Sequence, residues 1–199
     1  MELAGGGKRA LVIANTCDTF AQAERAPRVR REISALQGLD FQAEELDLRD
    51  YFDGGRSRTE LSARLDACDL LWARGGNSFI YRRAMRQSGF DELLLDLLSR
   101  DALVYGGYSG GIAVLAPSLE GIEIVNDPEA VPAGYDPGVI RDGLGLIPFS
   151  IAPHYKSNHF ASPGIDLVVQ YFIDHGMPYK TLHDGEAIVV DGDREELIA

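Results

Sequence analysis

Short, continuously apolar runs alternate with helical patterns along the first half of the chain. We expect strands at the apolar runs 9–14, 70–73 and 103–105 and at the segment 41–48, in which apolar and polar residues alternate. The stretches in which apolar residues recur at helical spacing lie between them, at 27–36, 59–66, 78–88 and 91–100. Strands that are apolar on both faces and separated by helices are typical of a parallel sheet covered on both sides. The pattern therefore predicts a three-layer α/β domain with a mostly parallel sheet.

Residues that start and stop helices support these boundaries. Gly38 follows the first helical stretch as a stop signal, Gly89 separates the two later stretches, and Thr59 is a candidate helix cap. In the last third we expect a helix at 165–174 and short strands at 121–125, 179–182 and 187–190. The stretch 128–145, rich in Gly, Pro and Asp, is typical of a long loop. Since no linker divides the chain, 1–199 is expected to form one domain, with a flexible start at 1–7.

Composition and charge narrow the classes of function. The chain has 199 residues, 19 basic and 31 acidic, with a net charge of −12. This balance argues against nucleic acid as a partner, because phosphate backbones are bound by clustered Lys and Arg. No apolar run reaches the roughly 18 residues of a membrane span, and the start lacks the layout of a secretory signal, so no membrane partner is expected. Cys17 and Cys68 are interpreted as reduced thiols, which favours a cytoplasmic location.

A glycine-rich segment after the strand at 103–105 is the main candidate for chemistry. Gly107-Tyr108-Ser109-Gly110-Gly111 fits the G-x-S-x-G nucleophile elbow. Small neighbours suit a serine on a sharp strand-to-helix turn, and the following apolar helix directs its first N–H groups at the same spot. The alternative is a tight turn in which Ser109 merely caps the helix.

A serine nucleophile needs a base and an acid that orients the base. His154 follows the apolar run 144–151 and is therefore expected at a strand end. Among the other histidines, His159 is either a substrate contact or solvated, His175 is typical of a helix end, and His183 precedes an Asp-Gly turn signal. For the acid, Asp127 and Glu129 lie in the segment VNDPEAV, where Asn-Asp-Pro is also a strong turn signal.

A second glycine-rich turn follows the strand at 70–73. Its small residues at 75–76 could bring backbone N–H groups close to a carbonyl oxygen and complete an oxyanion hole with the N–H of Gly110. The alternative is an ordinary strand-to-helix turn with Asn77 as the cap.

The sequence resembles the dipeptidase E family of serine peptidases, which includes the cyanophycinases. The segments that carry the resemblance are RGGNSF at 74–79, SGFDELL at 88–94, YGGYSGG at 105–111, VNDPEAV at 125–131 and IAPHYKSNH at 151–159. The resemblance implies a flavodoxin-like sheet related to class I glutamine amidotransferase domains. It also implies Ser109 as nucleophile, His154 as general base and Asp127 as orienting acid, with Glu129 as the alternative acid. Gly76 and Gly110 would supply the oxyanion N–H groups.

The chain departs from the family pattern at three places. Gly110 replaces the usual alanine of the elbow, and Arg74 replaces the first glycine of the other turn. The segment HFASPGIDLVV follows the His154 motif where the aspartyl dipeptidases have a basic stretch, so strict preference for amino-terminal Asp is not expected. The candidates for substrate contact are Arg74, Asn77, Lys156, Asn158 and His159.

We therefore expect a serine peptidase that hydrolyses dipeptides or short peptides through an acyl-enzyme. No metal or organic cofactor is expected, and the protein is expected as a monomer or homodimer. Two alternatives stay open. One is a non-catalytic relative that binds a small ligand in the same cleft, and the other is an esterase or amidase of another α/β family.

Overall fold

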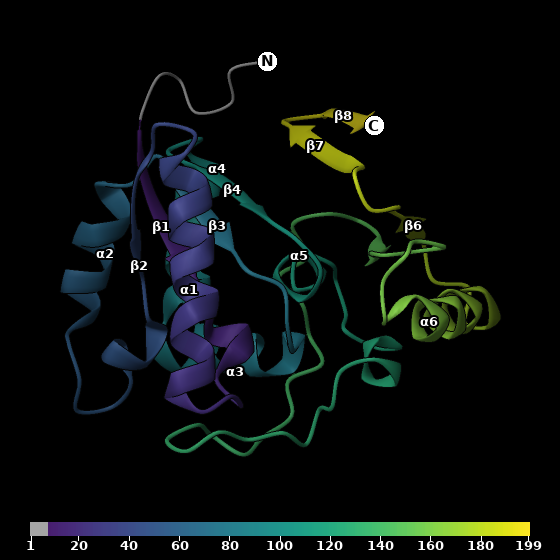
Figure 1. The fold of residues 1–199 in the computed structure, drawn as a ribbon, viewed down its shortest axis with the longest axis horizontal. Helices are drawn as coiled ribbons and strands as arrows, with labels where there is room; N and C mark the ends of the chain where they lie inside the picture. The colour runs from purple at the N-terminus through teal and green to yellow at the C-terminus, as the bar shows by residue number, and fades with distance from the viewer. Residues whose placement is uncertain (1–7) are drawn as a thin grey trace.

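A parallel four-stranded sheet forms the centre of the computed structural model, which describes residues 8–199 (Figure 1). The strands are β1 (Arg9–Ile13), β2 (Gln42–Glu45), β3 (Leu70–Ala73) and β4 (Val104–Gly107), in the order β2-β1-β3-β4. The expected α/β class with a mostly parallel sheet is thus confirmed. The segment 1–7, expected to be flexible, lies outside the described residues.

Helices cover both faces of this sheet. Ala10 and Val12 of β1 pack on the side of Leu36 in α1 (Gln22–Gln37), whereas Leu11 and Ile13 join a core with the helices of the other face. Those helices are α2 (Arg58–Asp66), α3 (Ser78–Ser88) and α4 (Phe90–Ser99). Since both sets of β1 side chains are buried, the strand is apolar without interruption, as a strand covered on both faces should be.

The second half of the chain adds two small sheets beside the first. After α5 (Gly110–Ala113), β5 (Ser150–Ala152) pairs in parallel with β6 (Tyr179–Thr181), and α6 (Ser162–Asp174) connects them. The strands β7 (Ala187–Asp191) and β8 (Arg194–Ile198) form an antiparallel hairpin that projects at the carboxyl end (Figure 1). Phe79 of α3, Ala113 of α5 and Ala152 of β5 share one apolar cluster with α6. This cluster is the seam between the four-stranded sheet and the β5–β6 pair.

Three local expectations are corrected by the structure. Ser57, not Thr59, caps α2, and it forms a capping box with Glu60. The expected strand at 121–125 is instead a short 3-10 helix, η3 (Ile122–Ile124), which begins after Gly121 at φ 87°. The strand β8 was not foreseen, because all of its residues are exposed and its pattern carries no buried face.

The long loop at 128–145 is held by buried side chains of the main domain. Arg83 of α3 donates hydrogen bonds to the carbonyl oxygens of Gly138 (2.9 Å) and Pro128 (2.7 Å). Tyr135 of the loop donates its hydroxyl proton to the carboxylate of Asp18. Asp18 in turn pairs with Arg25 of α1 at 2.5 Å, and both side chains are almost fully buried, at 0% and 2% exposed. The loop is therefore tied to the carboxyl end of the sheet.

The remaining 3-10 turns, η1 (Asn15–Cys17) and η2 (Leu48–Tyr51), follow β1 and β2 at that same end. Within residues 8–199, no helix is both long and apolar enough to cross a bilayer.

Candidate active site

Ser109 occupies a strained turn between β4 and α5. Its backbone has φ 52° and ψ −125°, a region that non-glycine residues rarely adopt and that costs about 1–3 kcal/mol. Its side chain makes no capping hydrogen bond to α5. The alternative interpretation, in which Ser109 merely caps this helix, is therefore not supported. A strained serine at the carboxyl edge of a parallel sheet, followed by a helix, is the arrangement that the nucleophile-elbow motif requires.

The second glycine-rich turn packs against this elbow. Gly76 has φ 149°, and a Cβ atom there would lie 2.6 Å from the carbonyl oxygen of Thr16. A Cβ on Gly75 would lie 2.9 Å from the Cβ of Ser109. Only glycine therefore allows the turn to approach the serine this closely. Among the described residues, the N–H groups of Gly76 and Gly110 find no acceptor, and both glycines line the same cleft as Ser109.

Asn77 caps the start of α3, as the alternative interpretation of this turn predicts. Its side-chain oxygen accepts from the N–H groups of Phe79 (2.9 Å) and Ile80 (3.3 Å), and its Nδ2 donates to the carbonyl oxygen of Asp127 at 2.7 Å. All these partners are protein groups, so Asn77 shapes the turn and is not among the residues that line the cleft.

His154 lies two residues beyond β5 and faces the cleft. Its Nδ1 lies 2.6 Å from Oδ1 of Asp184, which lies three residues beyond β6. Because β5 and β6 pair in parallel, with Ala152 opposite Thr181, their carboxyl ends bring the two side chains together. The imidazole is only 14% exposed. A carboxylate at Nδ1 holds the ring in the tautomer that leaves Nε2 free to accept a proton.

Asp127 and Glu129 do not contact His154. The Asp127 carboxylate accepts a hydrogen bond from the backbone N–H of Glu129 at 2.9 Å, and both residues are exposed. The acid expected at Asp127, with Glu129 in reserve, is therefore not the one that the structure brings to the histidine. This segment instead forms the local turn that Asn-Asp-Pro predicts. Its neighbour Asn126 does line the cleft, where its Oδ1 accepts from the N–H and hydroxyl of Ser78, both at 2.9 Å.

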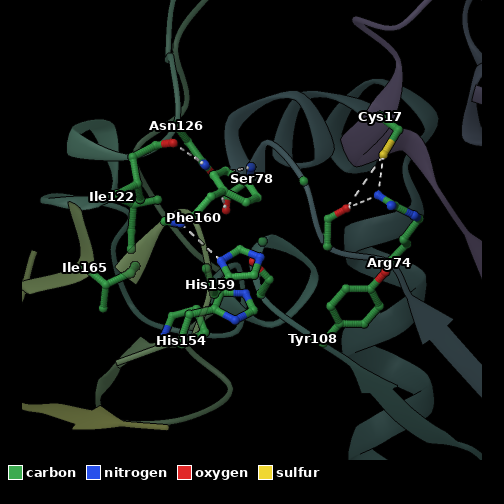
Figure 2. A pocket seen from close by; sticks show the side chains of 18 of the residues that line it. Cys17, Arg74, Ser78, Tyr108, Ile122, Asn126, His154, His159, Phe160 and Ile165 are labelled. Atoms are coloured by element: carbon green, nitrogen blue, oxygen red, sulfur yellow. Dashed lines mark hydrogen bonds between the residues drawn. The ribbon is translucent and has the colours of Figure 1, made fainter. Parts of the chain in front are cut away.

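His159 stacks on His154. The two ring centroids are 3.7 Å apart with planes 10° from parallel, and Nδ1 of His159 accepts from the N–H of Ala161 at 3.2 Å. Burial and the neighbouring His154 lower the pKa of His159 below its usual 6.5, although Asp184 opposes the shift. A neutral His159 thus supports one face of the His154 ring (Figure 2).

The cleft itself has a volume of about 300 Å³ and opens between the two parts of the fold (Figure 2). Of the residues expected from the sequence, it is lined by Ser109, Gly110, Gly76, His154, His159 and Arg74. Lys156 and Asn158 are exposed and lie outside it. Within residues 8–199, no group of three or more His, Cys, Asp or Glu side chains is placed to hold a metal ion.

Other lining residues were not expected from the sequence. They include Cys17, Phe20, Arg28, Tyr108, Ile122, Val125, Phe160 and Ile165. Most belong to loops or to helix positions whose pattern indicates packing alone, so only the tertiary structure brings them to the serine.

Comparison with known proteins identifies the family of this chain. Residues 20–198 match the model of peptidase family S51. The chain belongs to peptidase family S51. It is 32% identical over 158 residues to peptidase E of Streptomyces coelicolor, a match covering 76% of this chain and 59% of that protein. A Drosophila melanogaster protein named probable alpha-aspartyl dipeptidase is 26% identical over 151 residues, 73% of this chain and 60% of its own. The chain thus spans about three-fifths of these relatives.

Two solved structures of other proteins share the fold. A candidate peptidase E of Listeria monocytogenes superposes with a TM-score of 0.73 at 22% identity, covering 97% of this chain and 86% of that one. A peptidase from an acI-B1 actinobacterium gives a TM-score of 0.65 at 15% identity, covering 98% and 76%. At these identities the likeness concerns the fold alone.

Proposed function

We propose that this S51 protein is a serine peptidase that hydrolyses dipeptides or short peptides. The observation that carries the proposal is one cleft holding a strained serine, Ser109, and a histidine, His154, whose Nδ1 is bound by Asp184. Membership in a peptidase family supports the reaction class. In place of the acid expected at Asp127, we propose Asp184 as the residue that orients the base.

The mechanism follows from the roles of these groups. Nε2 of His154 removes the Ser109 proton as the hydroxyl oxygen attacks the scissile carbonyl carbon. Asp184 stabilises the imidazolium that forms. The carbonyl oxygen becomes an oxyanion that accepts hydrogen bonds from the N–H groups of Gly76 and Gly110.

Collapse of the tetrahedral intermediate breaks the peptide bond. The imidazolium gives its proton to the departing amine, which leaves an ester between the acyl group and Ser109. His154 then removes a proton from water, which attacks the ester, and the same proton returns to Ser109. None of these steps needs a metal or an organic cofactor.

The size of the cleft supports a small substrate. A volume of about 300 Å³ lies at the lower end of the range for small-molecule sites, which suits a dipeptide better than a folded protein. Because the basic stretch of the aspartyl dipeptidases is replaced here by HFASPGIDLVV, we do not propose strict selection for amino-terminal Asp. We also propose a flavodoxin-like sheet of the glutamine amidotransferase type, with Ser109 where those relatives carry cysteine.

The decisive experiment is Ser109→Ala, assayed with a panel of dipeptides. Hydrolysis should fall to background while thermal unfolding stays that of the unaltered protein, and Ser99→Ala, an exposed serine on α4, should behave as the unaltered protein. Hydrolysis retained by Ser109→Ala would exclude Ser109 as nucleophile.

Adding simple esters to the panel, together with a fluorophosphonate probe, separates the alternatives. An esterase would turn over simple esters and leave dipeptides intact. A non-catalytic ligand binder would fail to react with a fluorophosphonate probe, whereas the proposed enzyme should be labelled at Ser109.

A further inference from the structure

The charge of the cleft is opposite to that of the protein. The chain has a net charge of −12, yet two arginines, Arg28 and Arg74, line the cleft. Within residues 8–199, no Asp or Glu side chain lines it. A cationic cleft in an acidic protein indicates a ligand with negative charge.

The two arginines differ in the protein groups that already bind them. Arg74 lies 3.4 Å from a carboxylate oxygen of Glu32 and donates to the carbonyl oxygen of Gly75 at 2.6 Å. Glu32 also accepts from Tyr108 Oη (2.7 Å) and Trp72 Nε1 (3.1 Å). Arg74 is thus neutralised and fixed by groups of the protein.

Arg28 has no such partner among the described residues. It lies on α1 one turn before Glu32, is half-buried, and stacks its guanidinium 4.3 Å from the centre of the Phe20 ring. No carboxylate within residues 8–199 forms an ion pair with it. Phe20 thus contacts the guanidinium while, among the described residues, no acceptor takes its N–H groups, and the N–H fork of an arginine matches a carboxylate in geometry.

The cleft also has an apolar side. Figure 2 shows Ile122 and Ile165 on the side of the cleft away from Arg74 and Tyr108. The hydrogen bond from Tyr108 to Glu32 places α1, and with it Arg28, on the Arg74 side. The cleft therefore offers a cation on one side and an apolar wall on the other, with Ser109 in the same space.

We propose that Arg28 binds a carboxylate of the peptide substrate and so determines which peptides the enzyme accepts. This inference rests on the proposed peptidase function. The carboxylate has two possible sources in a short peptide, the chain terminus and an acidic side chain. In either case the peptide places its negative charge at Arg28 and an apolar side chain against Ile122 and Ile165.

The test compares Arg28→Gln and Arg28→Lys with the unaltered enzyme on matched peptides. One pair of substrates differs only in a free or amidated carboxyl terminus, and a second pair differs only in Asp or Asn as the acidic side chain. One of the two pairs tests the carboxylate that Arg28 binds. On the charged member of that pair, Arg28→Gln should lower kcat/KM about 10- to 100-fold, mainly by raising KM. On the neutral member the same substitution should change kcat/KM less than about threefold. Arg28→Lys should recover part of the loss.

Two controls keep this result separate from the proposed function. Labelling of Arg28→Gln by a fluorophosphonate without a carboxylate should match the unaltered enzyme, which shows that the serine site is intact. Arg30→Gln, an exposed arginine of the same helix, should not alter kcat/KM on either pair. If the unaltered protein is neither labelled nor active, the peptidase function fails. If it is active and Arg28→Gln affects charged and neutral members equally, or neither, the carboxylate role of Arg28 is overturned.

Discussion

Nδ1 of His154 lies 2.6 Å from Oδ1 of Asp184, thirty residues further along the chain. The contact arises because the strands before the two residues, β5 and β6, are parallel neighbours, so both side chains leave the sheet at the same edge. Asp127, which is nearer to the serine in sequence, uses its carboxylate in a local turn.

Asp184→Asn is expected to lower kcat/KM by roughly 10²- to 10⁴-fold, because an amide at Nδ1 stabilises the wrong tautomer of His154. Steady-state kinetics with a dipeptide substrate measures the loss. The matched substitution Asp127→Asn should stay within about threefold of the unaltered enzyme, since that side chain contacts only the turn. The reverse ranking would return the acid role to Asp127.

Gly76→Ala should damage both activity and stability. The residue has φ 149°, and the new Cβ would lie 2.6 Å from the Thr16 carbonyl oxygen, so the turn that presents the Gly76 N–H must move. We expect kcat to fall at least about tenfold and the free energy of unfolding to drop by about 1–3 kcal/mol. Gly138→Ala serves as the control in both kinetics and denaturant unfolding, because an added Cβ there meets nothing within 4 Å. Equal behaviour of the two variants would contradict the role given to the turn.

Arg25→Ala should be among the most destabilising single changes. It would leave Asp18, whose side chain is fully buried, without the guanidinium 2.5 Å away. Removing one partner of a buried pair costs about 3–5 kcal/mol, and urea unfolding would measure it. Arg30→Ala, on the exposed face of the same helix, should change the free energy of unfolding by no more than about 0.5 kcal/mol.

His159 should remain neutral at a pH where an exposed histidine is half protonated. Its pKa in the folded protein lies below 6.5, because burial and His154 disfavour the charged ring. The unfolded chain then binds more protons than the folded one as the pH falls through 6.5, so the free energy of unfolding decreases in that window.

The shift is measured by NMR titration of the His159 ring. His159→Phe keeps an aromatic face against His154 and removes the titrating group, so the unfolding free energy of this variant should depend less on pH between about 5 and 7. An ordinary titration midpoint for His159 would contradict the prediction.

The sequence predicts the part of the fold that depends on local pattern. The strand at 70–73 and the helix at 78–88 appear with the expected bounds, because continuous apolar runs and glycine stops act on neighbouring residues. The elbow at Ser109 follows from its small neighbours for the same reason.

The partners of His154 depend on pairing between distant strands. Asp184 looked like part of an Asp-Gly turn, and only the parallel register of β5 with β6 turns it toward the histidine. Likewise Arg28 lies on α1, in a stretch of basic and apolar residues that by itself indicates no site. Its place in the cleft depends on how α1 packs beside Tyr108, which no local spacing encodes.

The proposed reacting groups are divided between two sheets that share no strand. Ser109 belongs to the four-stranded sheet, while His154 and Asp184 follow the β5–β6 pair, and the seam between them is packed by Phe79, Ala113 and Ala152. Because Ser109 and His154 come from different parts of the fold, we expect turnover to depend on how closely the two parts pack together. Ala113 and Ala152 are both buried in this seam, so we expect a bulkier residue at either to lower activity by moving His154 away from Ser109, although every proposed reacting group would still be present.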